Sequence, residues 1–122
     1  MHELGIAMRI VDIASNVAKA NGVQAIEAIH VDIGTLTGVV PEALLFSFEA
    51  AANNTPMAKA RLLMNIIPGK ARCNLCHAIF SPEYFFMVCT TCGTTDCNII
   101  NGMELCVQSI IPAEDGVNPD DP

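Results

Sequence analysis

Four cysteines in two C-x-x-C pairs are the residues whose spacing most clearly indicates chemistry. Cys73 and Cys76 form the first pair and Cys89 and Cys92 the second, with twelve residues between the pairs. Structural zinc is held by four thiolates at about 2.3 Å, and each C-x-x-C turn presents two sulfurs to one side of the ion. Gly93 follows the last cysteine, where such a turn bends sharply. The pattern predicts a zinc ribbon with a closed site that leaves no position for catalysis.

Other uses of the cysteines fit less well. Iron in the same sulfur cage stays open, because the ligand type does not exclude it. A thioredoxin-like centre needs one C-x-x-C at a strand-to-helix junction, whereas this segment has two and little helical pattern. Cys97 could replace one ligand, although the regular spacing argues against it. Cys106 is expected to be buried within a strand.

The other chemically notable side chains near the pairs have structural interpretations. His77 adjoins a predicted ligand and is expected beside the metal site or at the surface rather than on the metal. His30 alternates with the apolar face of a predicted strand, and no role is assigned to it. The aromatic residues between the pairs are expected to pack the ribbon hairpin, with a partner surface as the alternative: Phe80, Tyr84, Phe85 and Phe86.

The extreme N-terminus offers a second set of metal ligands. The terminal amine, the backbone amide of His2 and its imidazole can chelate one ion through fused rings, and Glu3 can complete a planar set. Such a set suits Ni(II) or Cu(II). Taken alone the signal is weak, because any chain that begins Met-His provides these atoms.

Five predicted elements must position these residues. A helical pattern covers residues 4–20, with Ile6, Ile10, Ile13 and Val17 as its expected apolar stripe, and Asn21-Gly22 ends it. Alternation at residues 25–33 predicts a half-buried strand. Pro41 opens a second helix. Two further strands are expected at 60–67 and 103–111.

The fold predicted from these elements is α/β (α+β): a small mixed sheet of about three strands with two helices, plus an inserted four-cysteine zinc ribbon. Two strands alone make a poorly stable sheet, so the last strand is expected to return beside the first two. The expected domains are an α/β domain over 1–69 and 101–112, a zinc ribbon over 70–100, and a disordered acidic tail over 113–122.

Composition limits the classes of function. The formal net charge is −7, with 6 Lys and Arg against 13 Asp and Glu, which disfavours nucleic acid as a partner. No apolar stretch is long enough to span a membrane, and the N-terminus lacks the features of a signal peptide. We therefore expect a cytoplasmic protein, where thiols stay reduced. No set of acids and histidines has the spacing of a catalytic centre.

Taken together, these segments resemble the hydrogenase maturation nickel metallochaperone family (HypA/HybF). The resemblance covers about residues 1–111 and lies in the order and spacing of its motifs. These are the opening MHE, VDIG at 31–34, PEALLFSFEAA at 41–51, the spacing C-x2-C-x12-C-x2-C, and ELCVQSI at 104–110.

The resemblance implies a non-enzymatic protein that carries Ni(II) to nickel–iron hydrogenase, and in some organisms to urease. Met1, His2 and Glu3 would bind the transported nickel, and Cys73, Cys76, Cys89 and Cys92 a structural Zn(II). The implied partners are a nickel-insertion GTPase and the precursor of the hydrogenase large subunit, with no nucleic acid and no membrane. The alternative is a zinc-ribbon module that binds protein or nucleic acid and has no nickel function.

One position departs from the family pattern. Many members carry a histidine directly after the last zinc cysteine, where this chain has Gly93, and a histidine follows the second cysteine instead, as His77. The resemblance therefore assigns no role in sensing acidity or in assisting nickel to a histidine of this chain beyond His2.

Overall fold

The computed structural model describes residues 3–82 and 87–113. Its helices are α1 (Glu3–Ala20) and α2 (Pro41–Ala52), with a short 3₁₀ turn at Thr35–Thr37. The strands are β1 (Ile26–Gly34), β2 (Arg61–Ile67), β3 (Lys70–Cys73), β4 (Ile79–Phe80), β5 (Cys97–Asn101) and β6 (Leu105–Pro112). The expected ligands Met1 and His2, the aromatic residues 84–86 and nearly all of the expected tail lie outside the described residues.

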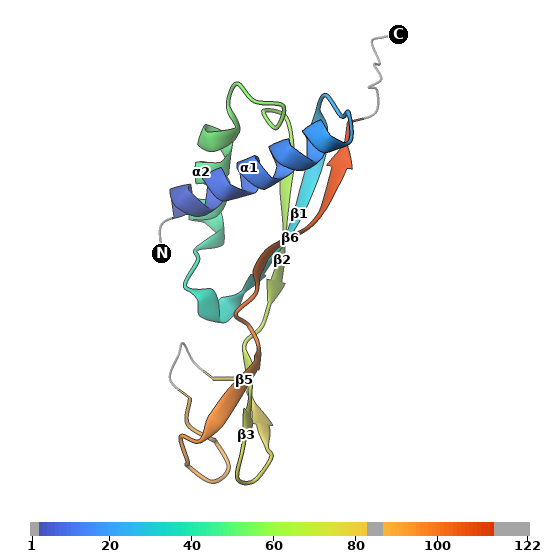
Figure 1. The fold of residues 1–122 in the computed structure, drawn as a ribbon. Helices are drawn as coiled ribbons and strands as arrows, with labels where there is room; N and C mark the ends of the chain where they lie inside the picture. Colours follow the sequence, from blue (N-terminus) through green and yellow to red (C-terminus); the bar gives the residue numbers. More distant parts are fainter. Residues whose placement is uncertain (1–2, 83–86, 114–122) are drawn as a thin grey trace. The chain divides into compact units, whose positions relative to one another are not determined.

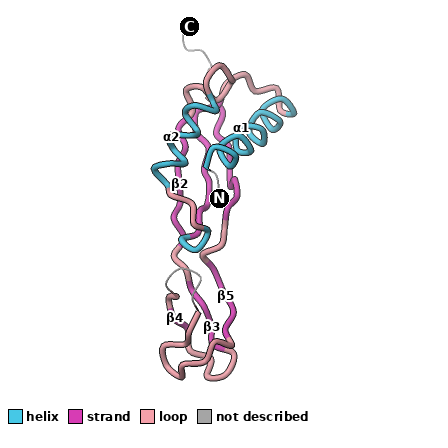
Figure 2. The backbone as a smooth tube through the Cα atoms, turned by 90° about the vertical axis from the view of Figure 1, so that its left-hand side faces the viewer, coloured by secondary structure: helices cyan, strands magenta, loops and turns pink. Residues whose placement is uncertain are grey.

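The strands form two sheets of three (Figures 1 and 2). One sheet has the order β2-β1-β6 and the other has the order β4-β3-β5. The last strand thus returns beside β1, and the segment with the paired cysteines forms its own sheet between β2 and β6 in the chain. The predicted fold class is confirmed.

The chain divides into two compact units, which we call unit 1 and unit 2. Unit 1 comprises residues 1–31, 40–64 and 107–122, and unit 2 comprises residues 32–39 and 65–106. Both helices lie in unit 1, and all six cysteines lie in unit 2. No helix in the described part of the chain is long and apolar enough to cross a membrane.

The buried face of α1 differs from the predicted stripe. Ile10 is buried as expected, but Ile13 and Val17 are each 41% exposed. The buried positions are instead those beside the stripe, where alanines predominate: Ala7, Ile10, Val11, Ala14 and Ala18. Small side chains let α1 pack closely in unit 1, where it contacts α2, so the larger Ile13 and Val17 lie at the margin of the contact.

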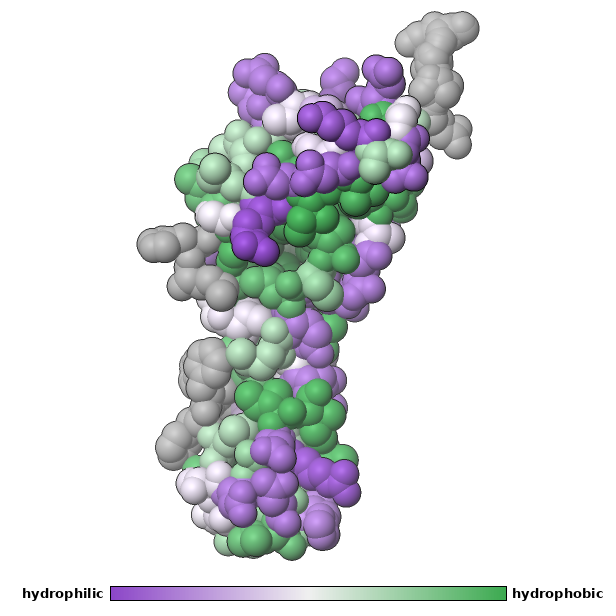
Figure 3. Space-filling model, in the orientation of Figure 1, coloured by the Kyte–Doolittle hydropathy of each residue, from purple (hydrophilic) through white to green (hydrophobic). Residues whose placement is uncertain are grey.

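The core of unit 1 follows the alternation of β1 and one face of α2. Ile29 and Val31 on β1 are buried, and Leu44 and Phe48 bury the inner face of α2. Leu45 is apolar too but is 37% exposed, because it lies beside the inner face rather than on it. Figure 3 shows hydrophobic residues remaining at the surface of this unit among polar ones.

In unit 2, the backbone of residues 34–36 lies close to the backbone of residues 102–104. The N–H of Leu36 donates to the carbonyl of Gly102 at 2.8 Å, and the N–H of Gly34 donates to the carbonyl of Glu104 at 2.7 Å. Gly102 has a φ of +113°, and a Cβ there would lie 2.5 Å from the Cα of Gly69. A glycine is required at this turn for both reasons.

Candidate metal centre

Two short turns bring the four cysteines of the C-x-x-C pairs together. Each turn follows a buried cysteine, Cys73 at the end of β3 and Cys89 in a loop, and the exposed Cys76 and Cys92 come three residues later. All four Sγ atoms lie within 4.8 Å of one another. In the part of the chain that the structure describes, this is the one group of histidine, cysteine or acidic residues gathered closely enough to hold a metal.

The two turns have the same hydrogen-bond pattern. In the first, the N–H groups of Leu75 and Cys76 donate to Cys73 Sγ at 3.4 and 3.3 Å. In the second, the N–H groups of Thr91 and Cys92 donate to Cys89 Sγ, both at 3.4 Å. These donors stabilise negative charge on the sulfurs, as a metal-binding thiolate requires.

Backbone bonds close each turn in the same way. The N–H of His77 donates to the carbonyl of Cys73 at 3.0 Å, and the N–H of Gly93 donates to the carbonyl of Cys89 at 2.9 Å. Both donors have positive φ, 66° for His77 and 79° for Gly93. His77 therefore occupies the turn position that Gly93 fills in the second pair, and its side chain is exposed. Its predicted placement beside the site or at the surface agrees with this geometry.

The sulfur spacing fits a tetrahedral ion. Cys73 Sγ lies 3.6 Å from Cys92 Sγ, and Cys76 Sγ lies 3.5 Å from Cys89 Sγ. A tetrahedron with metal–sulfur distances of about 2.3 Å has edges of about 3.8 Å. Four thiolates without an open position suit a closed structural site.

The proton affinities of the four thiols alternate. The N–H of Cys92 stabilises the Cys89 thiolate and lowers the pKa of Cys89 to about 6. The N–H of Cys76 likewise lowers the pKa of Cys73. The amide of Ala78 acts to lower the pKa of Cys76, but the neighbouring Cys89 and burial outweigh it and raise this pKa to about 12.

The pKa of Cys92 is raised in the same way as that of Cys76. The amide of Thr94 acts to lower the pKa of Cys92, but the neighbouring Cys73 and burial raise it. The directions of these pKa shifts favour Cys76 as the donor to Cys89 and Cys92 as the donor to Cys73 when no metal is bound.

The two remaining cysteines differ from each other. Cys97 is buried, and its thiol donates to the carbonyl of Thr94 at 3.8 Å. Burial, followed by the charge of Cys73, raises its pKa. Cys106 is exposed, so the predicted burial was wrong. Its neighbours Leu105 and Val107 are half-buried, and strand alternation turns Cys106 to the opposite face of β6.

Of the predicted nickel ligands, the structure describes Glu3. It is the first residue of α1, and its Oε2 accepts a hydrogen bond from the N–H of Val40 at 3.1 Å. Val40 is the N-cap of α2 and has no side-chain cap of its own. The Glu3 carboxylate thus does for α2 what a capping-box glutamate does within one helix.

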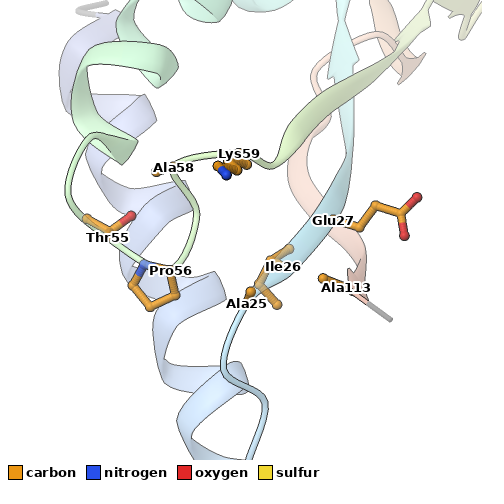
Figure 4. A pocket seen from close by; sticks show the side chains of 8 residues that line it. All are labelled: Ala25, Ile26, Glu27, Thr55, Pro56, Ala58, Lys59 and Ala113. Carbon is orange, nitrogen blue, oxygen red and sulfur yellow. The ribbon is translucent and has the colours of Figure 1, made fainter. Parts of the chain in front are cut away.

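Unit 1 contains a cavity of about 470 Å³ whose lining differs from that of the four-cysteine site (Figure 4). Its walls come from the start of β1, the loop after α2 and the end of β6, and they include Ile26 and Pro56. Among the described residues that line it, Glu27 and Lys59 are charged and none is a histidine or a cysteine. It offers no set of metal ligands.

Comparisons with known proteins agree on one family. A family described as "Hydrogenase/urease nickel incorporation, metallochaperone, hypA" matches residues 1–111. The chain is 40% identical over 116 residues to the hydrogenase maturation factor HypA of Chlorobium luteolum, covering 95% of this chain and 99% of that protein. It is 44% identical over 108 residues to HypA of Chloroflexus aurantiacus, covering 86% and 93%.

A solved structure supports the same fold. The solution structure of the nickel metallochaperone HypA from Helicobacter pylori matches with a TM-score of 0.64 and 23% identity, covering 92% of this chain and 97% of that one. At this identity the likeness carries the fold alone. With the sequence matches spanning both the N-terminal motif and the paired cysteines, the chain belongs to the HypA family of hydrogenase-maturation nickel metallochaperones.

Proposed function

We propose that this protein binds Ni(II) at its N-terminus and delivers it, without catalysing a reaction, during maturation of nickel–iron hydrogenase or of urease. The observation that carries the proposal is the family match over residues 1–111, because it includes the Met1-His2-Glu3 start and all four paired cysteines. A zinc-ribbon module without nickel function is not favoured, since nothing in its chemistry requires this N-terminal motif.

The proposed nickel ligands are the Met1 amine, the His2 amide and imidazole, and Glu3. The contact between Glu3 Oε2 and the N–H of Val40 supports the backbone amide of Glu3 as the fourth donor, because one carboxylate oxygen is already engaged. Four nitrogen donors of this kind suit square-planar Ni(II).

The proposed metal at Cys73, Cys76, Cys89 and Cys92 is Zn(II) in a structural role. Support comes from the four clustered sulfurs, from edges near those of a zinc tetrahedron, and from the amide donors to Cys73 and Cys89. We place the nickel site in a domain of residues 1–69 and 101–112 and the zinc site in a ribbon of residues 70–100, followed by a tail of residues 113–122.

The proposed partners are a nickel-insertion GTPase and the hydrogenase large-subunit precursor, and the proposed location is the cytoplasm. Handing on a metal requires complexes that separate, so micromolar affinity, about −8 kcal/mol, is expected. Pull-downs from cells making hydrogenase should recover one of the two partners. Failure to recover either under both nickel-replete and nickel-poor growth would contradict the partnership.

The nickel site is tested at the first atoms of the chain. The variant His2→Ala, an N-terminal acetyl group and one extra N-terminal residue should each abolish stoichiometric nickel binding, because each removes or displaces a ligand. Titration with Ni(II), followed by the absorbance of the planar complex, measures the effect. Acid should also release nickel as the imidazole protonates below about pH 6.5.

The control for these changes is the other metal. Zinc content and the helical circular dichroism should stay unchanged in all three forms, because the paired cysteines and the helices are untouched. If the extended protein binds one nickel as tightly as the native chain, the site lies elsewhere and His77 becomes the next candidate.

A further inference from the structure

Cys97 lies directly across the β3–β5 ladder from the ligand candidate Cys73. The two are Cα partners in the antiparallel pairing. The N–H of Asn74 donates to the carbonyl of Asp96 at 2.9 Å, so the hydrogen bond joins the residues flanking this pair rather than the pair itself. Cys73 and Cys97 are therefore a non-hydrogen-bonded pair.

That geometry is compatible with a disulfide. Opposed residues of a non-hydrogen-bonded pair have Cα atoms about 4.5 Å apart and side chains that approach each other. Disulfides span Cα separations of about 4.4 to 6.8 Å. A bond between Cys73 and Cys97 can therefore form without moving either strand.

Burial separates the roles of the three cysteines concerned. Cys73 and Cys97 are 0% and 9% exposed and belong to one buried cluster, whereas Cys92 is exposed. Cys97 is not among the four mutually close sulfurs. It is thus a buried thiol that adjoins the metal site without completing it. Cys76 and Cys92 are the two ligand candidates exposed to a dissolved oxidant, and Cys92 is the one whose Sγ lies 3.6 Å from that of Cys73.

We propose that Cys97 is a resolving cysteine: peroxide oxidation moves Cys73 from the metal site into a cross-strand disulfide with Cys97, which releases the metal reversibly. This rests on the metal proposed for the four cysteines. It adds a redox-sensitive site that the transport of nickel does not require.

The proposed oxidation has three steps. The Cys92 thiolate attacks peroxide, so that an S–O bond forms, the O–O bond breaks and hydroxide leaves. The Cys73 thiolate, 3.6 Å away, attacks the Cys92 sulfenic acid, and a Cys73–Cys92 disulfide forms as a second hydroxide leaves. The hydroxide released in the second step takes the proton of Cys97, and the Cys97 thiolate attacks the sulfur of Cys73 as Cys92 leaves as a thiolate, which water protonates.

The products explain the release. One peroxide accepts two electrons from two cysteines and becomes water. Cys76, Cys89 and Cys92 are left as thiols, so three ligands of four remain, and a single disulfide has to be reduced to restore the site. Without Cys97, the oxidation stops at the Cys73–Cys92 disulfide, which removes two of the four ligands rather than one.

Disulfide mapping of the zinc-loaded full chain tests the proposal. After equimolar hydrogen peroxide, zinc release is followed with a metallochromic indicator, and remaining thiols are alkylated. Digestion after glutamate and before aspartate cuts at Glu83, Asp96 and Glu104, which leaves Cys97 as the one cysteine of peptide 96–104. That peptide should be joined to the peptide carrying Cys73, and fragmentation of the linked pair distinguishes Cys73 from Cys76.

The variant Cys97→Ser should lose this linkage and should instead hold the disulfide between Cys73 and Cys92 after the same treatment. Cys106→Ser is the matched control and should behave as the native chain does. Linkages confined to Cys73, Cys76, Cys89 and Cys92 in the native chain would overturn the proposal.

Mapping the native chain decides the outcome even if Cys97→Ser does not fold. A purified protein without tightly bound zinc would contradict the proposed metal instead. The Cys73–Cys97 linkage can then still be sought in the metal-free chain, so the two failures are distinguishable.

Discussion

The cysteine side chains of the metal site differ in how readily they give up a proton, and this determines how metal binding depends on pH. Cys76, with a pKa of about 12, and Cys92, with a raised pKa, must each lose a proton to bind metal near neutral pH. Cys89, with a pKa of about 6, is already mostly ionised there. Below its pKa, Cys89 becomes a thiol and must release a further proton.

Proton release per metal ion should therefore increase, by up to one, as the pH falls from about 7.5 to about 5.5. Affinity should fall more steeply with acid over the same range. Calorimetric titration with Zn(II) in buffers of different ionisation enthalpy measures the released protons. A proton count that stays constant across this range would show that Cys89 does not have the lowered pKa.

The stability of the protein should also be sensitive to substitution of one glycine, Gly102. In Gly102→Ala the new Cβ would lie 2.5 Å from the Cα of Gly69, on top of the strain of a φ of +113°. We expect a loss of free energy of unfolding on the order of 3 kcal/mol. Gly38→Ala is the control, because its φ is +82° but its Cβ would meet nothing within 4 Å, and it should cost about 1–2 kcal/mol. Equal losses in urea denaturation would contradict a steric role for Gly102.

The roles of individual residues could be predicted from the sequence where they depend only on the local sequence pattern. The four paired cysteines could be found because two C-x-x-C turns are self-contained, and His77 could be placed outside the ligand set by its position. The opposition of Cys97 to Cys73 could not be predicted, because it depends on the register of β3 against β5, which includes an irregularity at Lys70 and Ala71. Burial of Cys106 was predicted wrongly, since alternation does not indicate which strand face is covered.

The helix α2 carries one buried and one exposed phenylalanine. Phe48 is 1% exposed and Phe46 is 75% exposed. Phe48→Ala should lower the free energy of unfolding by about 3–5 kcal/mol, because it opens a cavity in the core of unit 1. Thermal or urea unfolding measures this loss.

Phe46→Ala makes the same chemical change on the same helix. It should alter the free energy of unfolding by about 0.5 kcal/mol or less. Similar losses for the two variants would contradict the assigned faces of α2.

The order of the two helices and of β1, β2 and β6 could be predicted, because their periodicity and the signals at Asn21-Gly22 and Pro41 are strong. The short strands β3, β4 and β5 could not, because periodicity fades in the cysteine segment. The buried face of α1 could not, since its apolar stripe is wide and includes both large residues and alanines. The helix contact selects the alanine side, whose small side chains permit close approach to α2. Leu45 on α2 shows the same limit, because it is apolar and adjacent to the buried face without being part of it.

For the whole molecule, the two units should differ in their need for metal. Among the described residues, the buried cluster around the paired cysteines comprises Ala71, Cys73, Phe80, Cys89 and Cys97, with Ala78 and Met87 packed against it. This is too little apolar material to hold a fold without a metal. Chelation of the metal, or Cys73→Ala, should unfold the four-cysteine segment, while the helical circular dichroism persists because both helices lie in unit 1.

Hydrogen exchange resolved along the chain measures this difference. Protection should vanish over residues 70–101 and remain over α1 and α2. Cys106→Ser serves as the control and should retain protection in both regions. Loss of protection everywhere on chelation would show instead that the chain unfolds as one cooperative body.

The composition of unit 2 bears on how such a metal module can be transplanted or can evolve. Residues 65–106 are contiguous, but the unit also takes in residues 32–39, and Leu36 from that segment is buried where Gly69 and Gly102 leave room for it. The cysteine-bearing stretch is therefore not a cassette with two clean ends. A gene fragment that encodes 65–106 alone would lack Leu36, and recombination that preserves the module must carry both segments together.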